Sequence, residues 1–348
     1  MRRSNRLLLT GGGLTALLAV FCALPYLVAI YRIDILIFLL INVILAVSYR
    51  FLTLAGEFSL GHVVMMGVGA YGSALATKEA GLSVWLAAPL AAAFTGLLAL
   101  LLAFPLFRMK GFYFLIGSFA AGEAIRLSWN RFRDPFGGPG GIVFIPSPEI
   151  PLPVLGMFDV AADPIAYYFL CLAIVVITIF IFYRLEHSRF GLTLHAIHWK
   201  DVLAESVGVH IWWYKTFALV LASAFAGLAG GLLGHYLGTV NPVQFNLHIM
   251  LFVLVWVIVG GTRTIAGPVI GVIVLTVVDQ GLRGLDEWRP LFYGAILILT
   301  VMFLPDGLES LPRRARVWWE WAQHRGRPPV SDDEEEPPES DRPPPRDA

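Results

Sequence analysis

Charged residues are scarce in this sequence, and cysteine is nearly absent. Only 14% of the 348 residues are charged, whereas soluble domains contain about 25%. The two cysteines, Cys22 and Cys171, lie in apolar runs, so neither a disulfide framework nor a thiolate metal site is predicted. The phosphate-binding Gly-Lys loop, the metalloprotease helix motif and the Gly-x-Ser-x-Gly motif are also missing. These absences argue against a soluble protein and leave an enzyme without support.

Hydrophobic residues are abundant and make up 57% of the chain. They form several runs close to the roughly 20 residues that a helix needs to cross a bilayer. The sequence therefore predicts an all-α, polytopic transmembrane helical bundle with about ten spans. We expect the spans at 7–30, 35–54, 61–77, 82–107, 112–129, 165–183, 213–237, 247–259, 265–279 and 290–304.

Two of the predicted spans are short and interrupted by glycine, in the stretches 55–77 and 260–281. Glycine permits close helix contacts and backbone breaks, and a break allows freed carbonyl and amide groups to face a cavity. We expect broken or tilted helices here, and the pair is weak evidence for an internal repeat. Simple tight packing is the competing explanation for each glycine. The candidate residues at the two breaks are Ser59, Gly61, His62, Gly260, Gly261 and Gly267.

A polar stretch, 184–215, interrupts the apolar sequence. Two sets of residues recur there at helical spacing on different faces: Leu192, Ala196, Trp199 and Leu203, and His195, His198, Asp201 and Glu205. The pattern predicts one short amphipathic helix between turns at Gly191 and Gly208. Such a helix either docks a partner or lies on the lipid surface, and periodicity does not separate the two.

Few ionisable residues lie inside the predicted spans, where an unpaired charge is costly. Glu123 and Arg126 stand three residues apart, so we expect them to form a structural ion pair on one helix face. Glu57 and His62 flank the first glycine break. No His, Cys or carboxylate cluster completes a metal site around His195 and His198, so no metal is predicted.

Basic residues near span ends orient a membrane protein, because Lys and Arg concentrate on the cytoplasmic side. Basic residues within 2–6, 108–110, 184–189 and 313–316 agree with ten spans and both termini in the cytoplasm, whereas those within 126–133 count against it. Residues 1–34 are expected to be a retained anchor span, because their apolar run exceeds a signal-peptide core.

The C-terminal region changes composition after the last predicted span. Basic residues and three tryptophans in 313–324 predict a segment that lies at the membrane interface. Residues 325–348 are acidic and rich in proline, so we expect a disordered cytoplasmic tail.

Several motifs occur in an order that resembles a known family over residues 35–308. They are Phe58 to His62, Arg108-x-x-Gly111-x-Tyr113, Ala120-x-x-Glu123-x-x-Arg126, Gly137-Gly138-x-Gly140-Gly141, Ser188-x-x-Gly191, Gly208-Val209, Ala226 to Gly230, Gly260 to Pro268, and Leu304 to Leu308. Together they resemble the LivM-type permease subunit of ABC importers for branched-chain amino acids, with urea and amide permeases as close relatives.

The resemblance implies a permease domain over 35–312 in the bacterial plasma membrane, without catalytic residues or a cofactor of its own. ATP would be bound by partner ABC ATPase subunits. The other implied partners are a second homologous permease, a periplasmic or lipid-anchored solute-binding protein that faces the loop 137–142, and the lipid bilayer, with no nucleic acid. Alternating access would be driven through 184–215 as a cytoplasmic coupling helix, and the six residues at the glycine breaks would line the translocation path.

The residues that the resemblance assigns to ATPase coupling are Ser188, Gly191, Ala196, Asp201, Ala204, Glu205 and Gly208. Asp201, His198 and Leu203 stand where the family usually has Glu, Arg and Ala. The alternatives are an ion-coupled secondary transporter that uses Glu57, His62 or Glu123, a urea or short-amide permease, and a membrane scaffold without transport.

Overall fold

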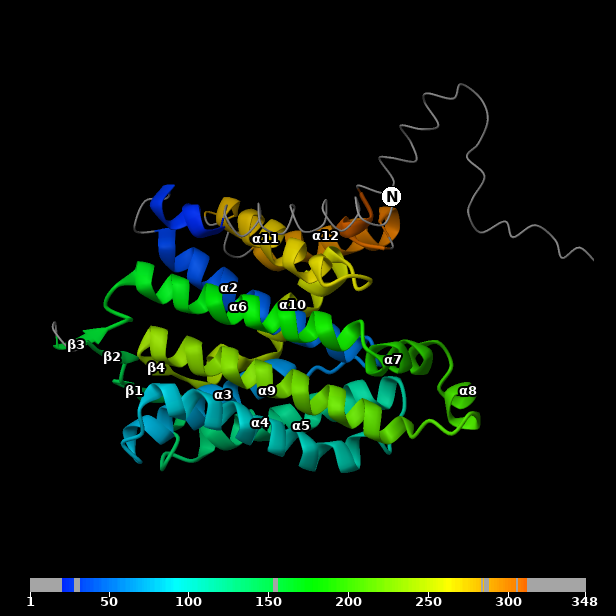
Figure 1. Cartoon of the computed structure of the whole chain (residues 1–348), viewed down its shortest axis with the longest axis horizontal. Coiled ribbons are helices and arrows are strands. Elements are labelled where there is room, and N and C mark those ends of the chain that lie inside the picture. The colour runs from blue at the N-terminus through cyan, green and yellow to red at the C-terminus, as the bar shows by residue number, and fades with distance from the viewer. Residues whose placement is uncertain are drawn as a thin grey trace, which may run out of the picture.

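The computed structural model describes residues 21–27, 32–152, 156–282, 284, 288–304 and 306–311. These residues form a bundle of long helices, with short strands at one end and two short helices, α7 and α8, at the other (Figure 1). The polytopic helical bundle predicted from the sequence is confirmed. The segments 313–324 and 325–348, and the expected anchor span except for the helical residues 21–27, lie outside the described part.

The other nine predicted spans correspond to helices that begin and end within three residues of the expected positions. These helices are α2 (Ile33–Thr53), α3 (His62–Lys78), α4 (Val84–Leu106), α5 (Phe112–Arg131), α6 (Pro164–Glu186), α9 (Ile211–Leu237), α10 (Leu247–Gly260), α11 (Ala266–Gly281) and α12 (Arg289–Phe303). Within the described residues, α2, α4, α6 and α9 are each long and apolar enough to cross a membrane. The helices α10 and α11 are shorter and also apolar.

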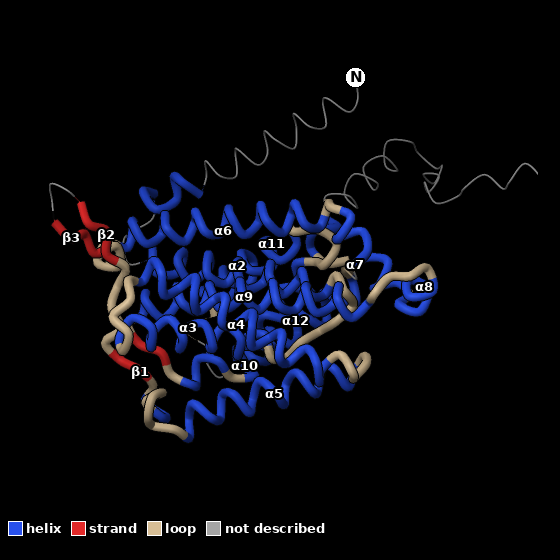
Figure 2. Tube along the Cα trace, turned by 60° about the horizontal axis from the view of Figure 1, so that its bottom comes forward, coloured by secondary structure: helices blue, strands red, loops and turns tan. Residues whose placement is uncertain are grey.

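Helix α2 lies at the centre of the bundle. It contacts α6, α9, α10 and α11. In its most apolar stretch of 18 residues, 78% of the residues are buried inside the protein. A helix that is hydrophobic on every face needs either lipid or protein on all sides. Figure 2 shows α2 enclosed by the neighbouring helices, so protein rather than lipid covers most of it. The polar residues near its C-terminal end are consequently held inside the protein.

Small residues bring α3 and α9 into close contact. A Cβ atom added at Gly69 of α3 would lie 2.0 Å from the carbonyl oxygen of Gly227 in α9, and one added at Gly230 would lie 1.8 Å from the carbonyl oxygen of Met66. In a membrane no hydrophobic effect drives helices together, so close backbone approach supplies much of the association energy. This crossing holds α3, and the loop that precedes it, against α9.

Four short strands lie at the end opposite α7 and α8 (Figure 2). β1 (Ile142–Val143) pairs antiparallel with β4 (Thr239–Val240), and β2 (Glu149–Leu152) pairs with β3 (Gly156–Asp159). No strand was expected from the sequence. The β1–β4 pairing attaches the long α5–α6 connection to the C-terminal end of α9.

Because Gly69 of α3 lies against Gly227 of α9, adding one methyl group at Gly69 should strongly affect stability. Gly69→Ala would force α3 and α9 apart, and we expect it to lower the free energy of unfolding by about 1–3 kcal/mol. Thermal unfolding of the purified protein in detergent measures this change. Gly294→Ala is the control, because an added Cβ in α12 meets no atom within 4 Å and alanine favours a helix by about 1 kcal/mol. Equal stability of the two variants would contradict the assigned role of the α3–α9 contact.

Candidate functional site

The polar segment 184–215 forms two short helices. α7 (Arg189–Trp199) begins after Ser188, whose hydroxyl oxygen accepts a hydrogen bond from the Phe190 amide at 3.2 Å. Lys200 is extended, and α8 (Asp201–Ser206) follows it. The expectation of one continuous helix was therefore wrong. Asp201 is the first residue of α8, and its carboxylate accepts a hydrogen bond from the Val202 amide at 2.9 Å.

These two helices expose an apolar surface, which we call the α7–α8 surface. Its five large members are between 64% and 83% exposed: Leu192, Trp199, Val202, Leu203 and Val207. The opposite side of the two helices, with Leu194 and Ile197, is buried against the bundle. Figure 1 shows α8 projecting beyond the long helices. A contiguous apolar patch on a projecting element is typical of a protein or membrane contact.

The seven residues assigned to coupling all lie on or beside these two helices, but they differ in exposure. Ala196, Glu205 and Gly208 are exposed, whereas Gly191 and Ala204 are buried. A Cβ atom at Gly191 would lie 2.0 Å from the carbonyl oxygen of Glu186, the last residue of α6. Gly191 therefore packs α7 onto the end of α6 and is not part of the exposed surface.

The first glycine break, the loop 54–61 before α3, lies against the same segment. The Lys215 ammonium group of α9 donates a hydrogen bond to the Glu57 carboxylate at 2.6 Å, and the two side chains are only 15% and 7% exposed. Burial raises the pKa of Glu57, and the hydrogen bond and charge of Lys215 offset part of this rise. Gly56 packs against His198 of α7. The loop 54–61 thus contacts the end of α7 and the first turns of α9.

Arg50, near the end of α2, forms a buried ion pair that was not expected from the sequence. Its guanidinium donates two hydrogen bonds to the Glu186 carboxylate, at 2.7 and 2.6 Å, and the side chains are 1% and 9% exposed. It also donates to the carbonyl oxygens of Thr262 and Arg263, each at 2.9 Å. Arg50 therefore joins α2, the end of α6 and the second glycine break, which is the loop 261–265.

Glu309 holds the opposite side of the loop 261–265. Its carboxylate accepts hydrogen bonds from the Arg263 amide at 2.8 Å, the Thr264 amide at 3.0 Å and the Thr264 hydroxyl. Gly261 has a φ of +114°, which favours glycine, and Glu309 lies directly against it. The Arg50 guanidinium binds the carbonyl groups of this loop, and the Glu309 carboxylate binds its amides. The backbone of the loop is therefore held from two sides.

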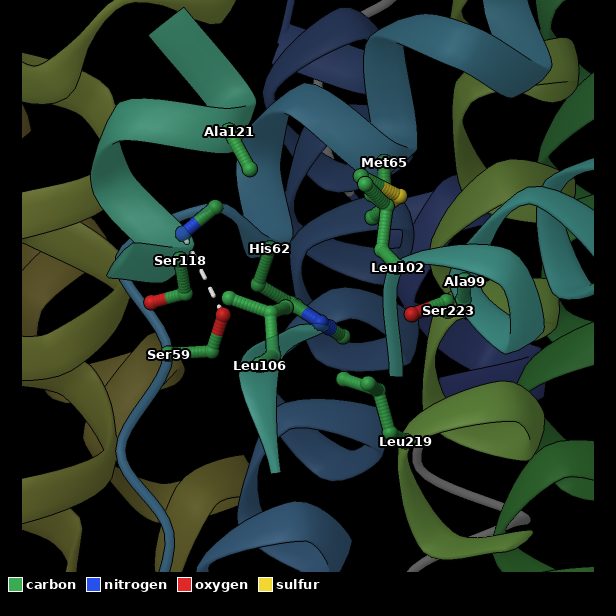
Figure 3. Close-up of a pocket in the computed structure, with 11 residues that line it drawn as sticks. Ser59, His62, Met65, Ala99, Leu102, Leu106, Ser118, Ala121, Leu219 and Ser223 are labelled. Atoms are coloured by element: carbon green, nitrogen blue, oxygen red, sulfur yellow. Dashed lines mark hydrogen bonds between the residues drawn. The ribbon is translucent and has the colours of Figure 1, made fainter. Parts of the chain in front are cut away.

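Ser59, Gly61 and His62 line a small cavity between α3, α4, α5 and α9, together with Ser118 and Ser223 (Figure 3). The His62 Nε2 atom lies 3.0 Å from the Ser48 hydroxyl. Among the described residues, the His62 Nδ1 atom and the Ser223 hydroxyl are buried without a hydrogen-bond partner. Unpaired buried polar atoms are costly, and the cavity has room for about one water molecule that could pair with them.

The remaining candidates lie elsewhere. Gly260 and Gly267 pack α10 against α11, because a Cβ at Gly260 would lie 2.1 Å from the Gly267 carbonyl oxygen. They flank the second break, which contains Gly261, and none of the three lines the cavity near His62. Glu123 and Arg126 are hydrogen-bonded to each other on α5, as expected for an ion pair within one helix.

The apolar helices define a polytopic membrane protein, and α7 and α8 expose apolar side chains at one end of it. A family model described as "Branched-chain amino acid transport system / permease component" matches residues 31–301. The chain belongs to this family of transport permeases, which are not enzymes.

Two curated relatives are permease proteins LivM of high-affinity branched-chain amino acid transport systems, from Salmonella typhimurium and Escherichia coli. Each is 29% identical in an alignment of 322 positions that covers 86% of this chain and 75% of the relative. The LivH permease protein of Salmonella typhimurium is 29% identical over 149 residues, or 42% of this chain and 46% of that protein. No solved structure matches.

A double-mutant cycle tests the contact between Glu57 and Lys215. Lys215→Met leaves a buried carboxylate without its cation, so we expect a larger loss of stability than in the double variant with Glu57→Gln. The coupling energy should reach about 0.5–3 kcal/mol in thermal or chemical unfolding. The Glu123–Arg126 pair gives the matched comparison, with about 0.2–0.5 kcal/mol expected for a pair within one helix. Additive effects at Glu57 and Lys215 would show that the contact does not tie the loop to α9.

Proposed function

We propose that this chain is the membrane-spanning permease subunit of an ATP-driven importer, and that a separate ATPase subunit docks on the α7–α8 surface. The observation that carries the proposal is the exposed apolar face of two short helices that pack on the ends of α6 and α9. A flexible loop would transmit little force, whereas α7 is packed on the bundle through Gly191, Leu194 and Ile197, and α8 contacts α9 and buries Ala204.

The solute in this proposal is a branched-chain amino acid or a similar small solute. Support comes from the LivM and LivH relatives, whose names specify high-affinity branched-chain amino acid transport. The proposed partners are ABC ATPase subunits, a second homologous permease and a periplasmic or lipid-anchored solute-binding protein. No cofactor is assigned to this subunit, because ATP would be bound by the ATPase.

The α7–α8 end faces the cytoplasm in this proposal. Arg108 and Lys110, which follow α4, and Arg184 and Arg189, which border the end of α6, lie at this end. Their position agrees with the concentration of basic residues on the cytoplasmic side of membrane proteins. Both termini then lie in the cytoplasm of a bacterial plasma-membrane protein.

The mechanism is alternating access, in which the helices shift as the ATPase subunits close. The cavity at Ser59, Gly61 and His62 is the part of the path that this subunit contributes. The ion-coupled alternative receives less support, because Glu57 and Glu123 are each held in an ion pair with a neighbouring cation.

Substitutions on the exposed surface test the docking step. The double variant Trp199→Ala/Leu203→Ala should lose the copurifying ATP-hydrolysing subunit, because a buried aromatic anchor contributes about 2 kcal/mol or more, roughly 30-fold in affinity. Trp288→Ala is the control, because Trp288 is also exposed but lies at the start of α12, at the opposite end of the bundle. The measurements are ATPase activity of the purified complex and uptake of leucine, valine, urea and short amides into proteoliposomes.

Two outcomes would contradict the proposal. One is full retention of the ATPase subunit by the double variant. The other is uphill uptake by vesicles that contain this chain alone, which would favour a secondary transporter.

A further inference from the structure

We propose that Arg50 is the positioning residue that transmits movement of the α7–α8 helices to the loop 261–265, and so to α11. This inference rests on the proposed function, because it assigns a route to the force that the ATPase applies. Arg50 contacts neither ATP nor solute in this role and acts through the groups that it holds.

The input side of the connection is Glu186. This residue ends α6, two positions before the Ser188 cap of α7. The backbone of Glu186 touches Gly191 of α7 so closely that an added Cβ atom would lie 2.0 Å from its carbonyl oxygen. Glu186 therefore moves together with the first turn of α7. The two parallel hydrogen bonds from Arg50 define both the distance and the orientation of its carboxylate.

The output side is the backbone of the loop 261–265. The same guanidinium binds the carbonyl groups of Thr262 and Arg263, while Glu309 binds the amides of Arg263 and Thr264. The loop cannot shift relative to Arg50 without losing charge-assisted hydrogen bonds inside the protein. Because this loop leads directly into α11, a displacement of Glu186 would reach α11 through one rigid side chain.

Stability alone does not account for this arrangement. Desolvation offsets most of the attraction in a buried ion pair, and apolar side chains of similar volume often stabilise a protein equally well. A planar guanidinium, however, can bind a carboxylate and two carbonyl groups at once, which no apolar side chain can do. The pair is therefore better suited to fixing the relative position of three segments than to holding the bundle together.

The test compares transport with ATP hydrolysis in the complete transporter. The complete transporter is reconstituted in proteoliposomes. It consists of this chain, its copurifying ATPase and permease partners, and the binding protein. The number of solute molecules imported per ATP hydrolysed is measured. In Arg50→Gln and Glu186→Gln we expect hydrolysis to continue while solute imported per ATP falls by roughly fivefold or more. Arg50→Lys keeps the positive charge but loses the planar set of N–H donors. Its solute imported per ATP should therefore lie between that of Arg50→Gln and that of the unmodified transporter.

Arg126→Gln is the matched control, since it removes an arginine from an ion pair that lies within a single helix. Its ratio of solute to ATP should equal that of the unmodified transporter.

The outcomes separate the inference from the proposed function. If the Arg50 and Glu186 variants lower uptake and hydrolysis in the same proportion, the ion pair only stabilises the fold and the inference is wrong. Glu186→Gln preserves side-chain shape and decides the question if the Arg50 variants fail to fold. If the unmodified chain recruits no ATPase, the proposed function itself fails.

Discussion

The guanidinium of Arg50 must find its acceptors inside the protein, because it lies almost out of contact with water at the end of the central helix α2. It finds them in the Glu186 carboxylate and in two carbonyl groups of the loop 261–265. The acceptors belong to two separate parts of the chain, so one desolvated charge on α2 determines how three segments are placed relative to one another. The end of α6, the start of α7 and the entry to α11 all depend on this requirement.

The bundle itself is held by a different kind of contact. Glycine and alanine let α3 approach α9, and glycines let α10 approach α11, so backbone atoms of neighbouring helices touch. These contacts involve no charged side chain, but a single added methyl group would clash with the backbone of the neighbouring helix. The structure thus separates two tasks, because small residues hold the spans together while buried ion pairs position the loops at the α7–α8 end.

The spans could be predicted from the sequence because length and apolar character alone define a membrane helix. The α7–α8 surface could be predicted in part, since the face with Leu192, Trp199 and Leu203 follows helical spacing. The break falls at Lys200, whose backbone is extended, and periodicity does not detect it. Arg50 could have been noticed as a charge inside a predicted span, but its partners stand 136 and 212 residues away. No sequence pattern identifies contacts at that separation, and the same holds for Ser118 and Ser223 beside His62.

The two glycine breaks are connected to the same segment through different ion pairs. Near the start of 184–215, Glu186 binds Arg50 and hence the loop 261–265, and at its end Lys215 binds Glu57 in the loop 54–61. Arginine binds through a planar fork that also takes backbone carbonyl groups, whereas lysine provides a point charge on a flexible stem. A displacement of α7 and α8 should therefore reach α11 through a stiff connection and α3 through a more compliant one. Unequal stiffness would let the two breaks respond by different amounts to one movement, as a gate that opens on only one side at a time requires.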